Sequence, residues 1–482
     1  MPSLKDLMTR LCLWCRHQNT LNSIIVKPMK IVNELIDKAK IFLDGNERSV
    51  AVKKNIVYSI LIRIISIVIS FLIVPVTIGY VSAELYGVWL TLSSIMAWLS
   101  FMDIGFTQGL KNRLAEAIAN DEWERGKELV STTYFMMMVI FIPAAIIIIW
   151  LVSFIDWCGL LNVERIYESE INKVMIVVIG FACLQMIVNV IVSVVAAFQK
   201  VALSNSFGVI GNVLSLFVII VLTKTCPPSL IYLSIAFCSL PVIVTLVASF
   251  LLFSNSFKCV APSFSRIKLP LVKDLFGLGY KFFIINIQAL ILYQSTNFLI
   301  SYVSSPLMVT SYNLAYRYMN LAMMFFTIIT APLWPAYTDA FAKEDYDWMI
   351  NTRVRMQEVF RASMILAIIM VALSPVFYRL WVGDKADVPF MMTLFVSAYV
   401  IVFCWLNLNG TLVVGMGKLK VQTLMCVVGM FIHIPLSIIL SRAIGAYGVL
   451  ASLALITLVY AIVINFQANI ILEKKAIGIW ME

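Results

Sequence analysis

Charged residues are scarce in this sequence, and so are the residues that usually carry acid–base or metal chemistry. Only 13% of the 482 residues are charged and only two are histidines, whereas 61% are hydrophobic. This composition lies far outside that of an ordinary soluble domain. The one CxxC pair, Cys12 and Cys15, has no second pair and no histidine cluster to complete a site. We therefore expect no metal centre and no cofactor.

The motifs of a membrane-bound enzyme are also missing. The sequence offers no nucleophile–base pair and no phosphate-cradling glycine-rich loop, and the glycines of 415–418 lack the spacing of a P-loop. The longest loop predicted on the outer side, about residues 155–170, is short for a domain that bears catalytic groups. We therefore expect that the protein is not an enzyme. A membrane glycan polymerase or ligase stays an alternative, and it would depend on outer-loop residues.

Apolar stretches long enough to cross a bilayer recur along nearly the whole chain after residue 54. Continuous apolar runs in lipid are typical of helices. The sequence therefore predicts an all-α polytopic membrane protein with twelve transmembrane helices. The predicted spans are about 56–79, 86–105, 131–154, 171–197, 207–223, 230–253, 279–303, 308–333, 360–382, 388–412, 419–440 and 447–472.

Basic residues predict how these helices are oriented. With the N-terminus inside, 27 of the 36 Lys and Arg residues lie on the inner side, 6 lie outside and 3 lie within spans. This split indicates a multi-pass membrane protein with both termini cytoplasmic. The net charge of +10 is then mostly orientation charge, so we expect no nucleic-acid partner.

Two weak internal repeats divide the chain into halves. Residues 80–85 are echoed by 302–307, and spaced residues of 195–211 are echoed in 413–429. Six helices in each half is an even number, so both halves keep one orientation. The repeat predicts two six-helix lobes related by a pseudo-two-fold axis along the membrane normal. The predicted divisions are a cytoplasmic amphipathic N-terminal extension (1–54), an N-terminal lobe (55–253), a cytoplasmic linker (254–278), a C-terminal lobe (279–473) and a cytoplasmic tail (474–482).

Arg63 and Arg317 are charges near the middle of two predicted spans. Each lies on a polar stripe with steps of three, four and seven residues, which places the stripe on one helix face. The stripes are Asn55, Ser59, Arg63, Ser66, Ser70 and Thr77, and Thr310, Asn313, Arg317, Asn320, Met324 and Thr327. A guanidinium at bilayer depth costs about 2.5–3.5 kcal/mol on insertion scales, so it usually faces a protein-lined or watery cavity. Two such faces predict a cationic cavity and an anionic cargo.

Further candidate residues lie on polar faces of the predicted helices. The candidates for cargo binding are Arg63, Arg317, Asn313, Asn320, Ser66, Asn297 and Lys281. Single Ser and Asn residues in membrane helices often only join neighbouring helices. Asp103 and His433 are candidates for coupling transport to ion movement. Alternatively, Asp103 caps the next helix or pairs with Arg63, and His433 is a hydrogen-bonded packing residue.

Several short stretches, in their order and spacing, resemble a known family. They are Ile78-Gly79-Tyr80, Glu84-Leu85-Tyr86-Gly87-Val88-Trp89, Asp103-Ile104-Gly105-Phe106, Tyr312-Asn313-Leu314-Ala315-Tyr316-Arg317, Pro332-Leu333-Trp334-Pro335-Ala336-Tyr337 and Leu380-Trp381-Val382-Gly383. Over residues 50–475 the chain resembles the polysaccharide flippases (Wzx-type O-antigen transporters) of the multidrug/oligosaccharidyl-lipid/polysaccharide exporter superfamily.

This resemblance implies two six-helix lobes around a central cavity. The implied cargo is an undecaprenyl-diphosphate-linked oligosaccharide, moved across the inner membrane by alternating access for O-antigen and lipopolysaccharide synthesis. The implied partners are membrane lipids and the polysaccharide polymerase machinery. Related lipid II flippases use intramembrane arginines on the opening helices of both lobes, and Arg63 and Arg317 lie on similar helices. A drug or cation antiporter of the same fold and a non-transporting scaffold are alternatives.

Overall fold

The structure, a computed structural model, describes residues 47–100, 106–272, 294–330 and 332–481. Within these ranges the regular structure is entirely helical. The N-terminal lobe comprises α2 (Glu47–Val81), α3 (Ala83–Ser100), α5 (Trp123–Val152), α7 (Glu168–Val188) with α8 (Val190–Ala197), α9 (Val201–Thr225) and α10 (Leu230–Ser254). The C-terminal lobe comprises α12 (Ser295–Val303), α13 (Pro306–Thr330), α15 (Tyr346–Trp381), α16 (Phe390–Gly415), α17 (Lys420–Ile444) and α18 (Tyr447–Leu472).

These helices account for the predicted spans. Among the described residues, nine helical segments are long and apolar enough to cross a membrane, with α7 and α8 forming one of them. With α3, α13 and α12 they make twelve, six in each lobe; most of the predicted span that α12 ends, 279–303, lies outside the described residues. The prediction of an all-α polytopic membrane protein with two six-helix lobes is therefore confirmed. Of the predicted N-terminal extension, only the residues from Glu47 onward are described, and they form the start of α2.

Helix ends are fixed by local polar groups. Asp345 precedes α15, and its Oδ1 accepts a hydrogen bond from the N–H of Trp348 at 3.0 Å. Before α10, the N–H of Leu230 donates at 2.7 Å to Oε1 of Glu170, which belongs to α7. Both carboxylates satisfy N–H groups that have no partner inside the helix. Glu170 also ties α7 to α10 within the N-terminal lobe.

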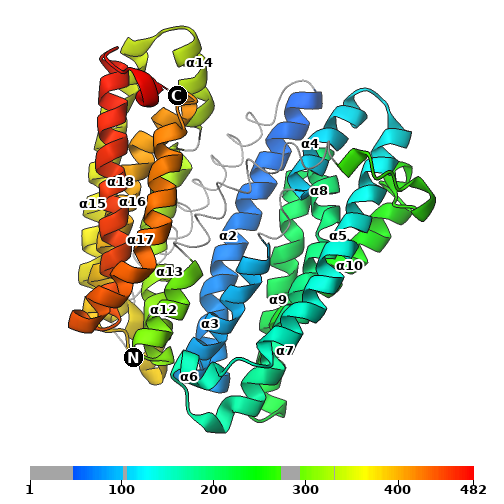
Figure 1. Ribbon diagram of the computed structural model, residues 1–482, viewed down its shortest axis with the longest axis vertical. Helices are drawn as coiled ribbons and strands as arrows, with labels where there is room; N and C mark the ends of the chain where they lie inside the picture. The colour runs from blue at the N-terminus through cyan, green and yellow to red at the C-terminus, as the bar shows by residue number, and fades with distance from the viewer. Residues whose placement is uncertain (1–46, 101–105, 273–293, 331, 482) are drawn as a thin grey trace, which may run out of the picture.

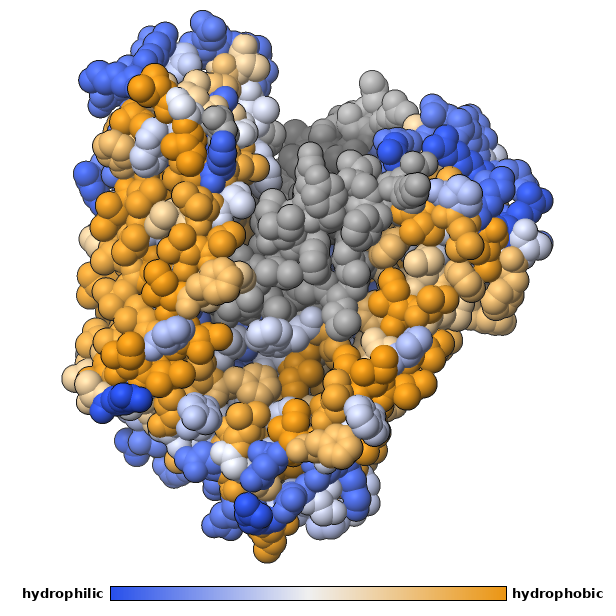
Figure 2. Space-filling view, viewed as in Figure 1, coloured by the Kyte–Doolittle hydropathy of each residue, from blue (hydrophilic) through white to orange (hydrophobic). Residues whose placement is uncertain are grey.

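The outer surface of the bundle matches a lipid environment. Figure 2 shows apolar side chains along the sides of both lobes, with hydrophilic residues gathered at the two ends. Large apolar side chains such as those of Phe217, Phe250, Ile368 and Phe431 are exposed. Such a surface is unfavourable in water and favourable against lipid tails.

The two lobes meet at one end and diverge toward the other (Figure 1). At the closed end, α3 packs against α12 and α13, and the short helix α6 (Trp157–Leu161) contacts α12. The diverging end carries α4 (Phe106–Ala119), α14 (Leu333–Ala342) and the C-terminus. On the orientation predicted from basic residues, this diverging end faces the cytoplasm and the closed end faces outward.

Candidate functional site

Arg317 joins the two lobes. It lies half-buried on α13 of the C-terminal lobe, and its Nη1 donates a hydrogen bond to the backbone carbonyl of Ser70 at 2.5 Å. Ser70 belongs to α2 of the N-terminal lobe, just before Pro75. A neutral carbonyl acceptor leaves the positive charge of the guanidinium uncompensated.

Arg63 lies on the same face of α2 as Ser70. The two residues are seven positions apart, which corresponds to two helical turns or about 10.5 Å along the axis. The side chain of Arg63 is exposed, and Ser66 between them is half-buried. The face of α2 that meets Arg317 therefore also carries Arg63, on the side of the diverging end.

Neither arginine pairs with a carboxylate in the described part of the chain. Most ion pairs of that part lie on the exposed surface, as between Arg361 and Glu358 at 2.6 Å. Two of the predicted site residues, Asp103 and Lys281, lie outside the described residues. Within the described ranges, the charge on this interlobe face is therefore positive.

The predicted asparagines take part in helix packing. Nδ2 of Asn313 on α13 donates to Oδ1 of Asn297 on α12 at 2.9 Å and to the carbonyl of Val309 at 2.9 Å. Nδ2 of Asn297 in turn faces the carbonyl of Leu90 on α3 at 3.4 Å. This chain of bonds links the C-terminal lobe to the N-terminal lobe and satisfies buried polar groups. Asn320, one turn beyond Arg317, is half-buried.

His433 is fully buried on α17. Its Nδ1 lies 3.2 Å from Oγ of Ser452 on α18, and the same hydroxyl donates to the carbonyl of His433 at 3.2 Å. These bonds join two neighbouring helices of the C-terminal lobe. These contacts occupy Nδ1, whereas Nε2 is buried without a hydrogen-bond partner, and a coupling role for His433 stays a prediction.

Arg353 is a half-buried arginine that was not among the predicted site residues. It lies on α15, and its guanidinium donates to three amide oxygens: Asn409 at 3.0 Å, Asn469 at 2.6 Å and Asn465 at 2.8 Å. The signal in the sequence is the pair Asn465 and Asn469, which lie one turn apart in a largely apolar helix. The amides satisfy the cation and tie α15 to α16 and α18.

Leucine at position 353 is expected to destabilise the C-terminal lobe. The substitution leaves three amide oxygens without their donor, and each buried unsatisfied group costs about 1–3 kcal/mol. Thermal unfolding of the purified protein in detergent measures the loss. Arg355→Leu, at an exposed position two residues on, is the matched control. Equal unfolding temperatures for the two variants would contradict a structural role for Arg353.

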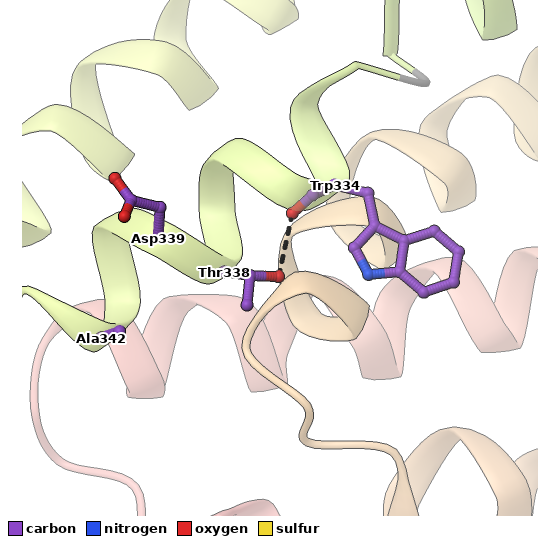
Figure 3. Close-up of a pocket in the computed structure, with 4 residues that line it drawn as sticks. All are labelled: Trp334, Thr338, Asp339 and Ala342. Carbon is purple, nitrogen blue, oxygen red and sulfur yellow. Dashed lines mark hydrogen bonds between the residues drawn. The ribbon is translucent and has the colours of Figure 1, made fainter. Parts of the chain in front are cut away.

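A shallow open pocket of about 600 Å³ lies on α14 at the diverging end, bordered by Trp334, Thr338, Asp339 and Ala342 (Figure 3). Thr338 donates to the carbonyl of Trp334 at 3.2 Å, and Asp339 pairs with Lys343 at 2.7 Å. The four lining residues include one carboxylate and no cation, which is unfavourable for an anionic ligand. No group of three or more His, Cys, Asp or Glu that could hold a metal occurs among the described residues.

The sequence and the fold are both similar to those of known proteins. A model of the family described as polysaccharide biosynthesis protein matches residues 52–341, which is more than half of the chain. No curated protein matches the sequence. Among solved structures, the fold is similar to an inward-facing multidrug resistance MATE family transporter of the MOP superfamily, with a TM-score of 0.72 at 12% identity over 86% of this chain and 98% of that chain.

Two further structures share the fold. The lipid II flippase MurJ in an inward closed conformation gives a TM-score of 0.61 at 14% identity, over 87% of this chain and 92% of that one. An outward-facing multidrug resistance MATE family transporter gives a TM-score of 0.60 at 13% identity, over 90% of this chain and 98% of that chain.

Proposed function

The chain belongs to the polysaccharide biosynthesis protein family, and we propose that it is a flippase for undecaprenyl-diphosphate-linked oligosaccharides in the bacterial inner membrane. Family membership confirms the resemblance seen in the sequence. The observation that carries the proposal is the interlobe face of α2. Arg317 reaches this face from the opposite lobe, Arg63 lies on it, and no described carboxylate pairs with either.

The diphosphate and the sugars of such a cargo need polar partners while they cross the bilayer. A sugar hydroxyl without a partner in hydrocarbon costs a few kcal/mol, and a buried unpaired diphosphate costs far more. A polar cavity with fixed positive charge replaces the lost water. Arginine suits this role because its planar fork binds phosphate bidentately and keeps its charge. The lipid tail of the cargo stays in the bilayer.

Alternating access fits the arrangement of the lobes. The lobes diverge toward the predicted cytoplasmic side and pack together on the outer side, so cargo enters from the leaflet where lipid-linked oligosaccharides are made. Outward opening requires the closed end to separate. The fold shared with a MATE transporter and with a lipid II flippase supports a mechanism of this kind. We expect the polysaccharide polymerase machinery to receive the flipped product.

Deletion of the gene in its native strain tests the proposal. A flippase deletion is expected to remove surface polysaccharide while lipid-linked oligosaccharide accumulates on the inner leaflet, and wild-type protein should restore the surface polymer. Single repeat units displayed on the outer surface would instead indicate a polymerase. Normal polysaccharide with altered resistance to cationic drugs would indicate an antiporter. Either of these results would overturn the flippase proposal.

A further inference from the structure

Pro75 leaves a backbone carbonyl of α2 without its usual partner. In an α-helix the carbonyl of Phe71 accepts from the N–H of residue 75, but proline has no N–H. The indole Nε1 of Trp381, at the end of α15 in the other lobe, donates to this carbonyl at 2.8 Å. The ring of Trp381 also packs on that of Phe71, with centroids 4.7 Å apart. The C-terminal lobe thus supplies a donor that α2 lacks.

Two more donors of the C-terminal lobe reach the same part of α2. Arg317 bonds the carbonyl of Ser70, and Nζ of Lys385 bonds the carbonyl of Pro75 at 3.2 Å. Gly79 leaves space for this lysine, because a Cβ at that position would lie 2.9 Å from Nζ. Three side chains therefore dock on carbonyls within residues 70–75. A carbonyl left without any donor at membrane depth is costly, so the bond from Trp381 to the Phe71 carbonyl favours the state in which the lobes touch here, and the other two bonds add to it.

We infer that Trp381, Lys385 and Arg317 form an outer latch on α2, and that Arg317 couples this latch to the cargo. The inference rests on the proposed function, since it gives Arg317 two alternative acceptors. A charge-assisted bond to diphosphate is stronger than a bond to a neutral carbonyl. Cargo that takes the guanidinium away from Ser70 weakens the latch and favours separation of the lobes on the outer side. A ligand shifts a conformational equilibrium only through such a difference between states.

The latch and the cargo step can be separated experimentally. Trp381 makes a latch bond without being a cargo residue, so its replacement tests the latch alone. Interlobe distance at the outer end is the direct readout. Thr225 at the end of α9 and Arg442 near the end of α17 are exposed positions in different lobes, suitable for spin labels attached by cysteine-independent chemistry.

Phenylalanine at position 381 is expected to open the outer end in the absence of ligand. The change removes the N–H donor and keeps an aromatic ring, so the outer-open fraction should rise roughly two- to tenfold, the effect of one hydrogen bond. Pro75→Ala gives α2 its own donor for the Phe71 carbonyl. In the Pro75→Ala background, Trp381→Phe should therefore raise the outer-open fraction much less, and a double-mutant cycle measures this difference.

Trp150→Phe is the matched control, because Trp150 is 61% exposed on α5 in the N-terminal lobe. It should leave the distance distribution unchanged. The latch would be overturned if Trp381→Phe showed the same outer interlobe distance distribution as the wild type. It would also be overturned if Trp381→Phe changed this distribution equally in the wild-type and the Pro75→Ala backgrounds.

Farnesyl diphosphate, with farnesol as the control that lacks phosphate, tests the cargo step on the full-length purified protein. Binding is measured by calorimetry, and the outer distance by the same labels. Farnesyl diphosphate should bind and lengthen the outer distance, whereas farnesol should not lengthen it. Binding without any change of distance would overturn the coupling and leave the proposed function standing. Absence of binding would overturn both.

Discussion

Alanine in place of Arg317 is expected to abolish surface polysaccharide while the protein still inserts at its normal level. The reason is that Arg317 supplies a fixed positive charge on the interlobe face at Ser70, whereas Lys385 reaches α2 further along the helix, at Pro75. Loss of one partner from a desolvated charge pair costs about 2–5 kcal/mol, which corresponds to a decrease in affinity of roughly thirtyfold to several thousandfold. Arg63→Ala is expected to act in the same direction.

Lysine at either position should retain partial function, because it keeps the charge and loses the bidentate fork. Surface polysaccharide is quantified in a deletion strain that carries each variant, together with the amount of protein in the membrane. Arg361→Ala is the control, since Arg361 is exposed and pairs with Glu358 at the surface. Normal polysaccharide in a strain with alanine at both 63 and 317 would end the cationic-site model.

Alanine in place of Gly87 is the substitution with the largest expected structural effect. A Cβ at this position of α3 would lie 1.8 Å from the backbone oxygen of Pro306, at the start of α13. Backbone atoms cannot turn aside as side chains do, so the two helices must separate. The nearby bond from Thr310 to the carbonyl of Ala83, now 2.6 Å, would lengthen as well. Overpacking of this kind costs about 1–3 kcal/mol and sometimes more.

The consequence falls on the closed end of the molecule, where α3 and α13 join the lobes. We expect Gly87→Ala to lower the unfolding temperature, to broaden the outer interlobe distance and to remove transport. Gly180→Ala is the matched control, because a Cβ at Gly180 on α7 of the same lobe meets no atom within 4 Å. Equal stability and transport for the two variants would contradict the close approach at Gly87.

Hydropathy predicts the transmembrane helices well because lipid demands long apolar runs. The last predicted span, 447–472, coincides with α18. The same signal misses charged extensions that continue a helix beyond the bilayer. For this reason α15 begins at Tyr346 although the predicted span begins at residue 360, and α5 begins at Trp123 although the predicted span begins at residue 131.

Helical periodicity could place Arg63 and Ser70 on one face of α2, but it could not reveal what meets that face. The acceptors of Arg317, Trp381 and Lys385 are backbone carbonyls, which have no signature in the sequence. Only Pro75 hints that one of these carbonyls needs an external donor. Arg353 was missed for a related reason, since its partners come from two other helices far along the chain.

Translocation by the purified protein in liposomes tests the central claim most directly. A fluorescent oligosaccharide linked to undecaprenyl diphosphate is placed in the bilayer, and a reductant that cannot cross the membrane quenches the label in the outer leaflet. Wild-type protein should make nearly all of the label accessible, whereas protein with alanine at positions 63 and 317 should leave about half of it protected. Equal quenching for both proteins would contradict a cationic path between the lobes.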